Sequence, residues 1–420
     1  MLRFILADLG RLKAGSAVVV LLIALAVALG VGVTLQERAL RLGSARAADK
    51  FDLVIGAPAS ETQLVLSTVF LQPAALPLVS GAILAELQGD PRVAWAAPVG
   101  FGDFHDGAPV IGTTTRLITE TAPGFAEGRT FAAEGEAVVG AMVALAVGDT
   151  ITPTHGELRQ GGHGHDGVAY RVTGKLKPTG TAWDRAILVP IQAVWHVHGL
   201  EAGHDHDHDH ADAAAPDHDH EHEAAGFDPD APLEENLQGA EMPGVPAILV
   251  KPASIADAYR LRQDYRADPR SMAVFPAEVL TSLYGTLGDA RQVLVAVAAG
   301  AQALVGAALL LVTLTHISQR RRQIGALRAL GAPRGAIFLL VWTELFALIA
   351  CGTLLGLAGG YLAARLLSAA ISAEQGFTLP VELASSDFAG LGVLLGVAAV
   401  LAALPAFIAY RQSPVASLRG

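Results

Sequence analysis

The sequence predicts an α-helical membrane protein with four transmembrane helices and a large α+β extracytoplasmic domain between the first and second helix. Composition is the first reason, since 52% of the 420 residues are apolar and the mean hydropathy is +0.44. These values exceed those of an ordinary soluble protein. The second reason is a set of long apolar runs, and the third is the clustering of basic residues at particular ends of those runs.

Four apolar runs are long enough to cross the ~30 Å hydrocarbon core as helices. The predicted transmembrane helices are residues 14–36, 292–315, 335–364 and 388–410. Basic residues lie in 1–13, 316–334 and 411–420, so we expect these segments, including both termini, in the cytoplasm. Segments 37–291 and 365–387 then lie outside, the second as a loop. The first run is too long for a signal-peptide core and is interpreted as a retained anchor.

The outer segment alternates between strand-like and helix-like patterns, which predicts a mixed α+β domain. The only cysteine, Cys351, lies in the third apolar run, so no disulfide is expected in this domain. The predicted helices are 79–88 and 254–265, the latter capped by Ser254. The predicted strands are 51–56, 92–101, 109–113, 137–140, 170–176, 186–189 and 247–250.

A segment of different composition, 201–235, interrupts the outer domain. It contains thirteen Asp or Glu and seven His without a single Lys or Arg, so we expect a disordered insertion. Alternating imidazoles and carboxylates are suited to zinc, and copper or nickel could bind as well. Without fixed geometry such a tract binds several ions weakly; the alternative is a solvated acidic linker. The candidate metal ligands are His204, His206, His208, His210, His218, His220 and His222.

Six other histidines of the outer segment lie outside this tract, at positions 105, 155, 163, 165, 196 and 198. A folded metal site built from His155, His163 and His165 is conceivable from their spacing. Ordinary loop histidines remain the simpler interpretation, because spacing alone is weak evidence for a site.

The connection between the second and third apolar runs contains a compact basic cassette, residues 320–334. Ile324, Leu327 and Leu330 form an apolar stripe on a predicted amphipathic helix, a pattern typical of docking into a groove of another protein. Positive-inside charge without docking is the alternative. The candidate coupling residues are Arg320, Arg321, Arg322, Gln323, Ile324, Leu327, Arg328 and Leu330.

The third apolar run contains Gly352, Gly356 and Gly360, which repeat every fourth residue and predict a close helix–helix contact. No G-x-x-x-x-G-K-[ST] phosphate loop is present: Gly174-Lys175 is followed by Leu176. The chain is therefore not expected to be an enzyme, and any ATP hydrolysis must come from a partner. No nucleic-acid partner and no intrinsic cofactor are expected, apart from zinc or another divalent metal on the His-rich tract.

Together, the cassette, the terminus Pro405 to Arg419 and the segment Glu134 to Thr150 resemble the FtsX-like permease family. This family comprises the membrane subunits of MacB-type and lipoprotein-releasing ABC transporters. The cassette resembles the family's "REIGxLRALGA" and the terminus its "PAxxAxRxxPxxxLR". One departure is Gln323, where the family commonly has Glu; the change removes a charge that could pair with the ATPase and leaves the helical pattern intact.

The resemblance implies a permease subunit in a bacterial inner membrane, with its large domain in the periplasm. Its expected partners are a second permease copy, as homodimer or heterodimer, and separate ATP-binding subunits docked on the cassette. An extracytoplasmic binding protein or lipoprotein is a further candidate partner. ATP hydrolysis would then move the outer domain against a lipoprotein, peptide, lipid or metal-linked cargo.

A narrower resemblance, in Asp52 to Phe70 and Pro178 to Asp184, is to a bacterial subgroup with His-rich insertions that we associate with zinc-responsive transport. It does not identify the cargo. Two alternatives stay open: a non-transport regulator that relays the ATPase state to an outer-face partner, and a secondary zinc transporter. The second is disfavoured because Glu344 and Cys351 are the only potential metal ligands in the four predicted spans, and they form no chain of ligands from one membrane face to the other.

Overall fold

The computed structural model describes residues 13–155, 163–164, 167–200, 226–233, 237, 242–285 and 331–411, with scattered positions between 292 and 307. The chain divides into two compact units. The first, the membrane unit, comprises residues 1–41, 286–370 and 379–420. The second, the outer domain, comprises residues 42–285 and 371–378. Each is described by itself.

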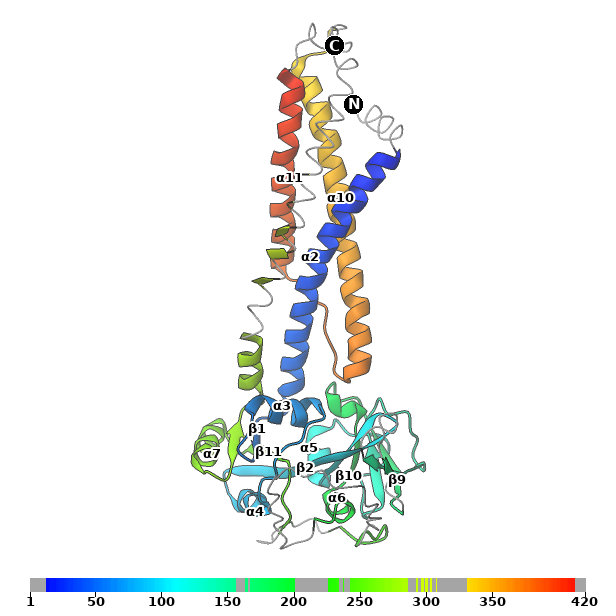
Figure 1. The fold of residues 1–420 in the computed structure, drawn as a ribbon, viewed down its shortest axis with the longest axis vertical. Coiled ribbons are helices and arrows are strands. Elements are labelled where there is room, and N and C mark those ends of the chain that lie inside the picture. Colours follow the sequence, from blue (N-terminus) through cyan, green and yellow to red (C-terminus); the bar gives the residue numbers. More distant parts are fainter. Residues whose placement is uncertain are drawn as a thin grey trace, which may run out of the picture. The chain divides into compact units, whose positions relative to one another are not determined.

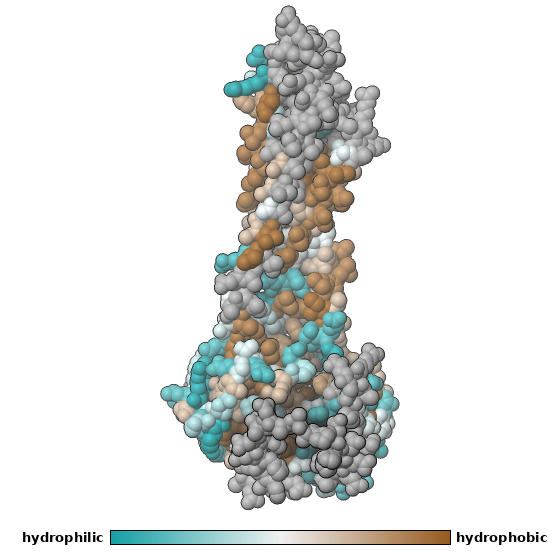
Figure 2. Space-filling model, in the orientation of Figure 1, coloured by the Kyte–Doolittle hydropathy of each residue, from teal (hydrophilic) through white to brown (hydrophobic). Residues whose placement is uncertain are grey.

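Three helices in the described part of the chain are long and apolar enough to cross a membrane. They are α2 (Lys13–Ala48), α10 (Arg334–Gln375) and α11 (Ser385–Arg411) (Figure 1). The predicted span 292–315 is described only at scattered helical positions. Leu21 and Leu25 on α2 are 66% and 67% exposed, and brown apolar surface covers much of these helices in Figure 2. Exposing such apolar surface to lipid costs less free energy than exposing it to water.

Two of these helices run further than the sequence predicts. The span expected at 14–36 belongs to α2, which continues to Ala48. The segment 365–387, expected as an outer loop, is helical up to Gln375, so the loop before α11 is much shorter. Both extensions contain good helix formers such as Leu40, Leu42 and Ala370, and neither contains a Gly or Pro stop at the predicted boundary.

Within the membrane unit, polar contacts connect the helices as well as apolar packing. Arg38 on α2 donates two hydrogen bonds to the Asp387 carboxylate of α11, at 2.7 and 2.8 Å. Their side chains are 17% and 14% exposed, so the bidentate pair is largely shielded from water. Trp342 Nε1 on α10 donates to the Ala399 carbonyl of α11 at 2.9 Å. These contacts fix α2, α10 and α11 against one another.

The outer domain contains short helices and a mixed sheet, as the alternating pattern predicts. Every predicted strand is present, within a few residues of its expected ends. The helices are α3 (Glu61–Phe70), α4 (Gly81–Gly89), α5 (Thr115–Thr121), α6 (Ile191–Val197) and α7 (Ile255–Ala267), with a 3-10 turn η2 (Ala182–Arg185). Residues 276–285 are also helical. The strands are β1 (Leu53–Gly56), β2 (Val93–His105), β3 (Ala108–Thr113), β4 (Phe125–Gly128), β5 (Glu136–Val139), β6 (Thr150–Ile151), β7 (Thr154–His155), β8 (His163–Gly164), β9 (Tyr170–Leu176), β10 (Ile187–Pro190), β11 (Ala247–Pro252) and β12 (Met272–Val274).

The main path of the described sheet runs β12-β1-β11-β2-β3-β10-β5-β9-β4, and β7 pairs with both β2 and β8. β10 runs parallel to β3 and β5 parallel to β9, while the other pairs are antiparallel. Along β9, from Tyr170 to Leu176, buried residues alternate with more exposed ones, as expected of a strand with one face on the core. Ser254 caps α7 by accepting a hydrogen bond from the Asp257 amide, which confirms the predicted cap.

Part of the predicted disordered insertion, 201–235, is ordered. Residues 226–233 are placed against the domain, and Ala133 bridges Pro232 in an antiparallel contact. Phe227 packs edge-on against the buried Tyr170 ring, with centroids 5.6 Å apart. Asp and His dominate the composition of the segment, so its average composition does not indicate that apolar residues at its end, such as Phe227, pack on the domain. Positions 201–225 lie outside the described residues.

Candidate functional site

A carboxylate and two imidazoles meet in the outer domain. Asp103 comes from β2, His155 from β7, and His198 is the residue that ends α6. Asp103 Oδ1 lies 3.4 Å from His155 Nδ1, and Asp103 Oδ2 lies 3.4 Å from His198 Nε2. The two imidazole rings stand edge to face, with centroids 5.7 Å apart. One ligand atom from each residue lies within 4.8 Å of the other two.

Strand register and a bulge bring these three side chains together. Asp103 is the direct antiparallel partner of His155, which places both side chains on the same side of the β2–β7 pair. The β2–β3 register shifts between Gly100 and Asp103, and such a bulge redirects the side chains that come after it. A Cβ at Gly102 would lie 3.3 Å from His198 Nε2, so the glycine leaves room for that ring.

The charge in this site is shielded from solvent. The Asp103 side chain is 5% exposed and that of His198 is 21% exposed, whereas His155 is 65% exposed. Burial raises the pKa of the nearby Tyr170 phenol, and the Asp103 and Glu134 carboxylates raise it further. Tyr170 is therefore neutral. Two buried carboxylates thus share one region of the domain.

A second acid–histidine pair involves α6 as well. Glu134 Oε1 lies 2.8 Å from His196 Nδ1, and Glu134 Oε2 accepts a hydrogen bond from the Asp228 amide at 3.3 Å. The Glu134 side chain is 5% exposed. A Cβ on Gly226 would lie 3.6 Å from the His196 ring. The pair therefore fastens the returning end of the insertion to α6 and to residue 134.

The sequence-predicted metal ligands are only partly within the described residues. His155 belongs to the Asp103–His155–His198 cluster, and His163 is its register partner in β8. His165 and all seven histidines of the tract lie outside the described residues. The sequence did not indicate Asp103 or His198 as ligands. No local spacing could have paired them, because the contact depends on β2–β7 register and on where α6 ends.

The predicted coupling residues 320–330 also lie outside the described residues. The chain is described again from Gly331, which adopts φ +93°, a conformation that favours glycine, and α10 begins at Arg334 directly after Pro333. The structure places Gly352, Gly356 and Gly360 of α10 against α2, where a Cβ would come within 3.0 Å or less of α2 backbone or side-chain atoms.

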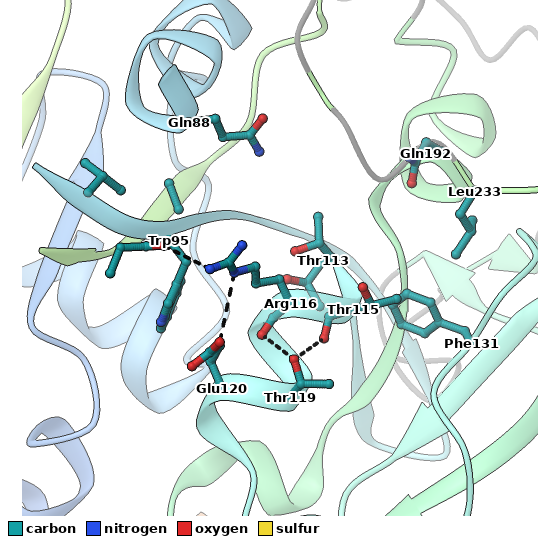
Figure 3. A pocket seen from close by; sticks show the side chains of 14 residues that line it. Gln88, Trp95, Thr113, Thr115, Arg116, Thr119, Glu120, Phe131, Gln192 and Leu233 are labelled. Atoms are coloured by element: carbon teal, nitrogen blue, oxygen red, sulfur yellow. Dashed lines mark hydrogen bonds and ion pairs between the residues drawn. The ribbon is translucent and has the colours of Figure 1, made fainter. Parts of the chain in front are cut away.

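The outer domain also contains a polar cleft of about 440 Å³ beside α5 (Figure 3). Arg116 projects across it but donates to the Ala94 carbonyl at 3.0 Å and pairs with Glu120 at 4.0 Å. The other labelled side chains are neutral residues such as Gln88, Thr113 and Gln192. The charged groups are thus engaged with each other, and nothing in the cleft indicates a reaction or ligand.

Part of the chain matches the model of a known protein family. Residues 295–415 match the family model described as FtsX-like permease C-terminal. No curated protein matches the chain. Among solved structures, the periplasmic region of MacB from Actinobacillus actinomycetemcomitans is similar at 9% identity and a TM-score of 0.32, covering 56% of this chain and 95% of that one. The extracellular domain of the noncanonic ABC-type transporter YknZ from Gram-positive bacteria is similar at 11% identity and a TM-score of 0.29, covering 53% and 98%.

Proposed function

We propose, from the premise that the chain belongs to the FtsX-like permease family through residues 295–415, that it is the permease subunit of a MacB/FtsX-type ABC transporter. Permeases of this family are transport components that work with a partner ATP-binding subunit. The single observation that supports the proposal best is that the matched region includes the whole basic cassette, 320–334, together with α10 and α11.

The ATP-binding subunit would dock on the apolar stripe of the cassette, formed by Ile324, Leu327 and Leu330. The cassette leads through the Gly331 turn into α10. A helix transmits an axial or rotational displacement along its length because its backbone hydrogen bonds are continuous. Residues 331–333 between the cassette and α10 are not helical, so a movement imposed on the cassette would reach α10 as a pull through this short connection and would then be carried along the helix.

Contacts within the membrane unit would pass that movement to the other helices. The glycine side of α10 packs closely on α2, and Arg38 of α2 is held by Asp387 of α11. Since α2 continues unbroken to Ala48, past the boundary between the units at residue 41, its displacement would reach the start of the outer domain. The domain would then act on a lipoprotein, peptide, lipid or metal-linked cargo outside the inner membrane.

By the family resemblance, the complete transporter would contain a second permease copy, as a homodimer or heterodimer. The His/Asp-rich tract would bind zinc weakly and exchangeably from the extracytoplasmic side. Binding would weaken as pH falls toward the imidazole pKa of ~6.5, when protons compete for the ligands.

The test of coupling is to place one negative charge on the docking stripe and an identical charge on the opposite face. Leu327→Asp should abolish copurification of the ABC ATPase that accompanies the wild-type chain and should abolish ATP-driven activity. Ala329→Asp is the matched control, because it lies about 160° around the helix from Leu327. Retention of the ATPase by Leu327→Asp, or absence of any ABC ATPase from the wild-type complex, would refute the proposal.

A further inference from the structure

We propose that Asp103, His155 and His198 bind a single zinc ion in the folded outer domain, at a site separate from the His-rich tract. One carboxylate and two imidazoles are a ligand set that zinc accepts readily. Three protein ligands leave a fourth position of the tetrahedron for water or for a donor from a cargo or partner. The site therefore has the composition of an open zinc centre.

The spacing of the three side chains is close to that of ligands around one zinc ion. Zinc ligands at about 2.1 Å in a tetrahedron are separated from one another by about 3.4 Å. His155 Nδ1 lies 3.4 Å from Asp103 Oδ1 and His198 Nε2 lies 3.4 Å from Asp103 Oδ2, so each imidazole faces its own carboxylate oxygen, and a shared zinc ion needs a small rotation of one side chain. A direct N–H to oxygen hydrogen bond is usually about 2.7 to 3.2 Å. The remaining separation, between the two imidazoles, is within 4.8 Å, and the exposed His155 ring has room to adjust.

The surroundings favour a cation. The Asp103 side chain is 5% exposed, and a carboxylate attracts a cation more strongly in a shielded place than in water. Gly102 opens space next to both rings, since a Cβ there would lie 3.3 Å from His198 Nε2 and 3.9 Å from His155 Cε1. A metal bound here would tie the end of α6 to β2 and β7.

The position of the site along the chain suggests how it would be filled. His198 is followed by Gly199 and Leu200, and the His/Asp-rich segment begins at the next residue. The described chain resumes at Gly226, beside His196 of the same short helix. Both described ends of the insertion thus lie next to α6, whose C-terminal cap is the ligand His198. Tethered imidazoles raise the local concentration of exchangeable zinc, which would speed loading of the folded site.

The experiment must separate the folded site from the tract. In the full chain, purified in detergent, all seven tract histidines are first replaced by serine, and Zn²⁺ is titrated against a competing chromogenic chelator. This background should still bind one zinc ion per chain. His155→Ala in the same background should weaken binding by about 100-fold or more, because even outer partners of metal ligands are worth about 10–100-fold. Since His155 is 65% exposed, this variant should keep the metal-free melting temperature of the background.

Two further variants complete the test. Asp103→Asn keeps the size of the side chain but removes its charge, and it should also weaken zinc binding. His105→Ala is the matched control, a histidine on the same strand whose Nδ1 lies 3.0 Å from the Thr152 carbonyl oxygen, and it should bind zinc like the background. Zinc should raise the melting temperature of the background and of His105→Ala, but not that of His155→Ala. No zinc uptake by the background, unchanged affinity in His155→Ala, or an equal loss in His105→Ala would each overturn the proposal and leave the cluster as ion pairs.

Discussion

Replacing Gly356 by alanine should loosen the contact between α2 and α10. The added Cβ would lie 2.6 Å from the Ala24 carbonyl oxygen and 2.6 Å from Val27 Cβ, whereas ordinary contacts begin near 3.4 Å. The two backbones would have to separate by about 0.8 Å, the difference between these distances. Separation also lengthens the contacts at Gly352 and Gly360, because close-packed interfaces cannot deform at one point alone. Overpacking of this kind costs about 1–3 kcal/mol.

The assay is reversible unfolding of the purified chain in mixed micelles, followed by helical circular dichroism as the denaturing detergent increases. Gly359→Ala is the matched control on the same helix, since its Cβ would lie 3.9 Å from Ala28 Cβ, an ordinary contact. Both variants gain the same intrinsic helix propensity, about 1 kcal/mol, so the difference between them isolates the packing cost. Equal stability of the two variants would show that the glycine contact between α2 and α10 is not tightly packed.

Three other predictions concern charge and the insertion. Asp387→Asn should destabilise the membrane unit by about 1–3 kcal/mol, because Arg38 loses its charged hydrogen-bond partner in a partly shielded place. The double variant with Arg38→Met should recover part of this loss in a double-mutant cycle. The Arg129 guanidinium holds the pKa of the Glu136 carboxyl below its usual range. This pair therefore stabilises the folded domain fully above the pKa of Glu136 in the unfolded chain, about 4.3. The stabilisation is lost as pH falls through the lower pKa of the folded state. Arg129→Gln should therefore lower stability by about 1 kcal/mol at pH 7, a modest value because Arg129 is 57% exposed, and by nothing at the acid end of a melting series. Replacing 201–225 by a short Gly-Ser linker should leave the melting temperature unchanged, whereas deleting 201–235 should lower it, because the longer deletion removes Phe227 from Tyr170.

Local patterns predicted much of the secondary structure, and particular residues show why. The alternation in 170–176 and the Ser254 cap are properties of a few neighbouring residues, and both are present in the structure. The helix at 61–70 was not predicted from its pattern: its central residues Leu64 and Val65 are both buried, and its end depends on Leu71 in a left-handed conformation. Burial of these side chains in the domain, not local sequence preference, stabilises this helix.

The candidate zinc cluster could not be predicted in the same way. His155 stands out in the sequence because other histidines come soon after it, but its closest acidic partner, Asp103, comes from a distant strand. The β2 bulge and the end of α6 decide which side chains meet, and neither leaves a recognisable local signal. The family resemblance, by contrast, rested on contiguous motifs, and two of them, the cassette and the terminus, lie within residues 295–415, which match the FtsX-like permease C-terminal model.

The proposed coupling mechanism requires the basic cassette and the His-rich tract to lie on opposite sides of the inner membrane. A single cysteine, Ala329→Cys or Ala214→Cys, introduced after Cys351→Ala, can be treated with a membrane-impermeant maleimide in cells whose outer membrane alone is permeable. We expect immediate labelling at 214 and labelling at 329 only after the inner membrane is disrupted. Labelling of both positions in intact spheroplasts, or of 329 alone, would contradict this topology and the mechanism with it.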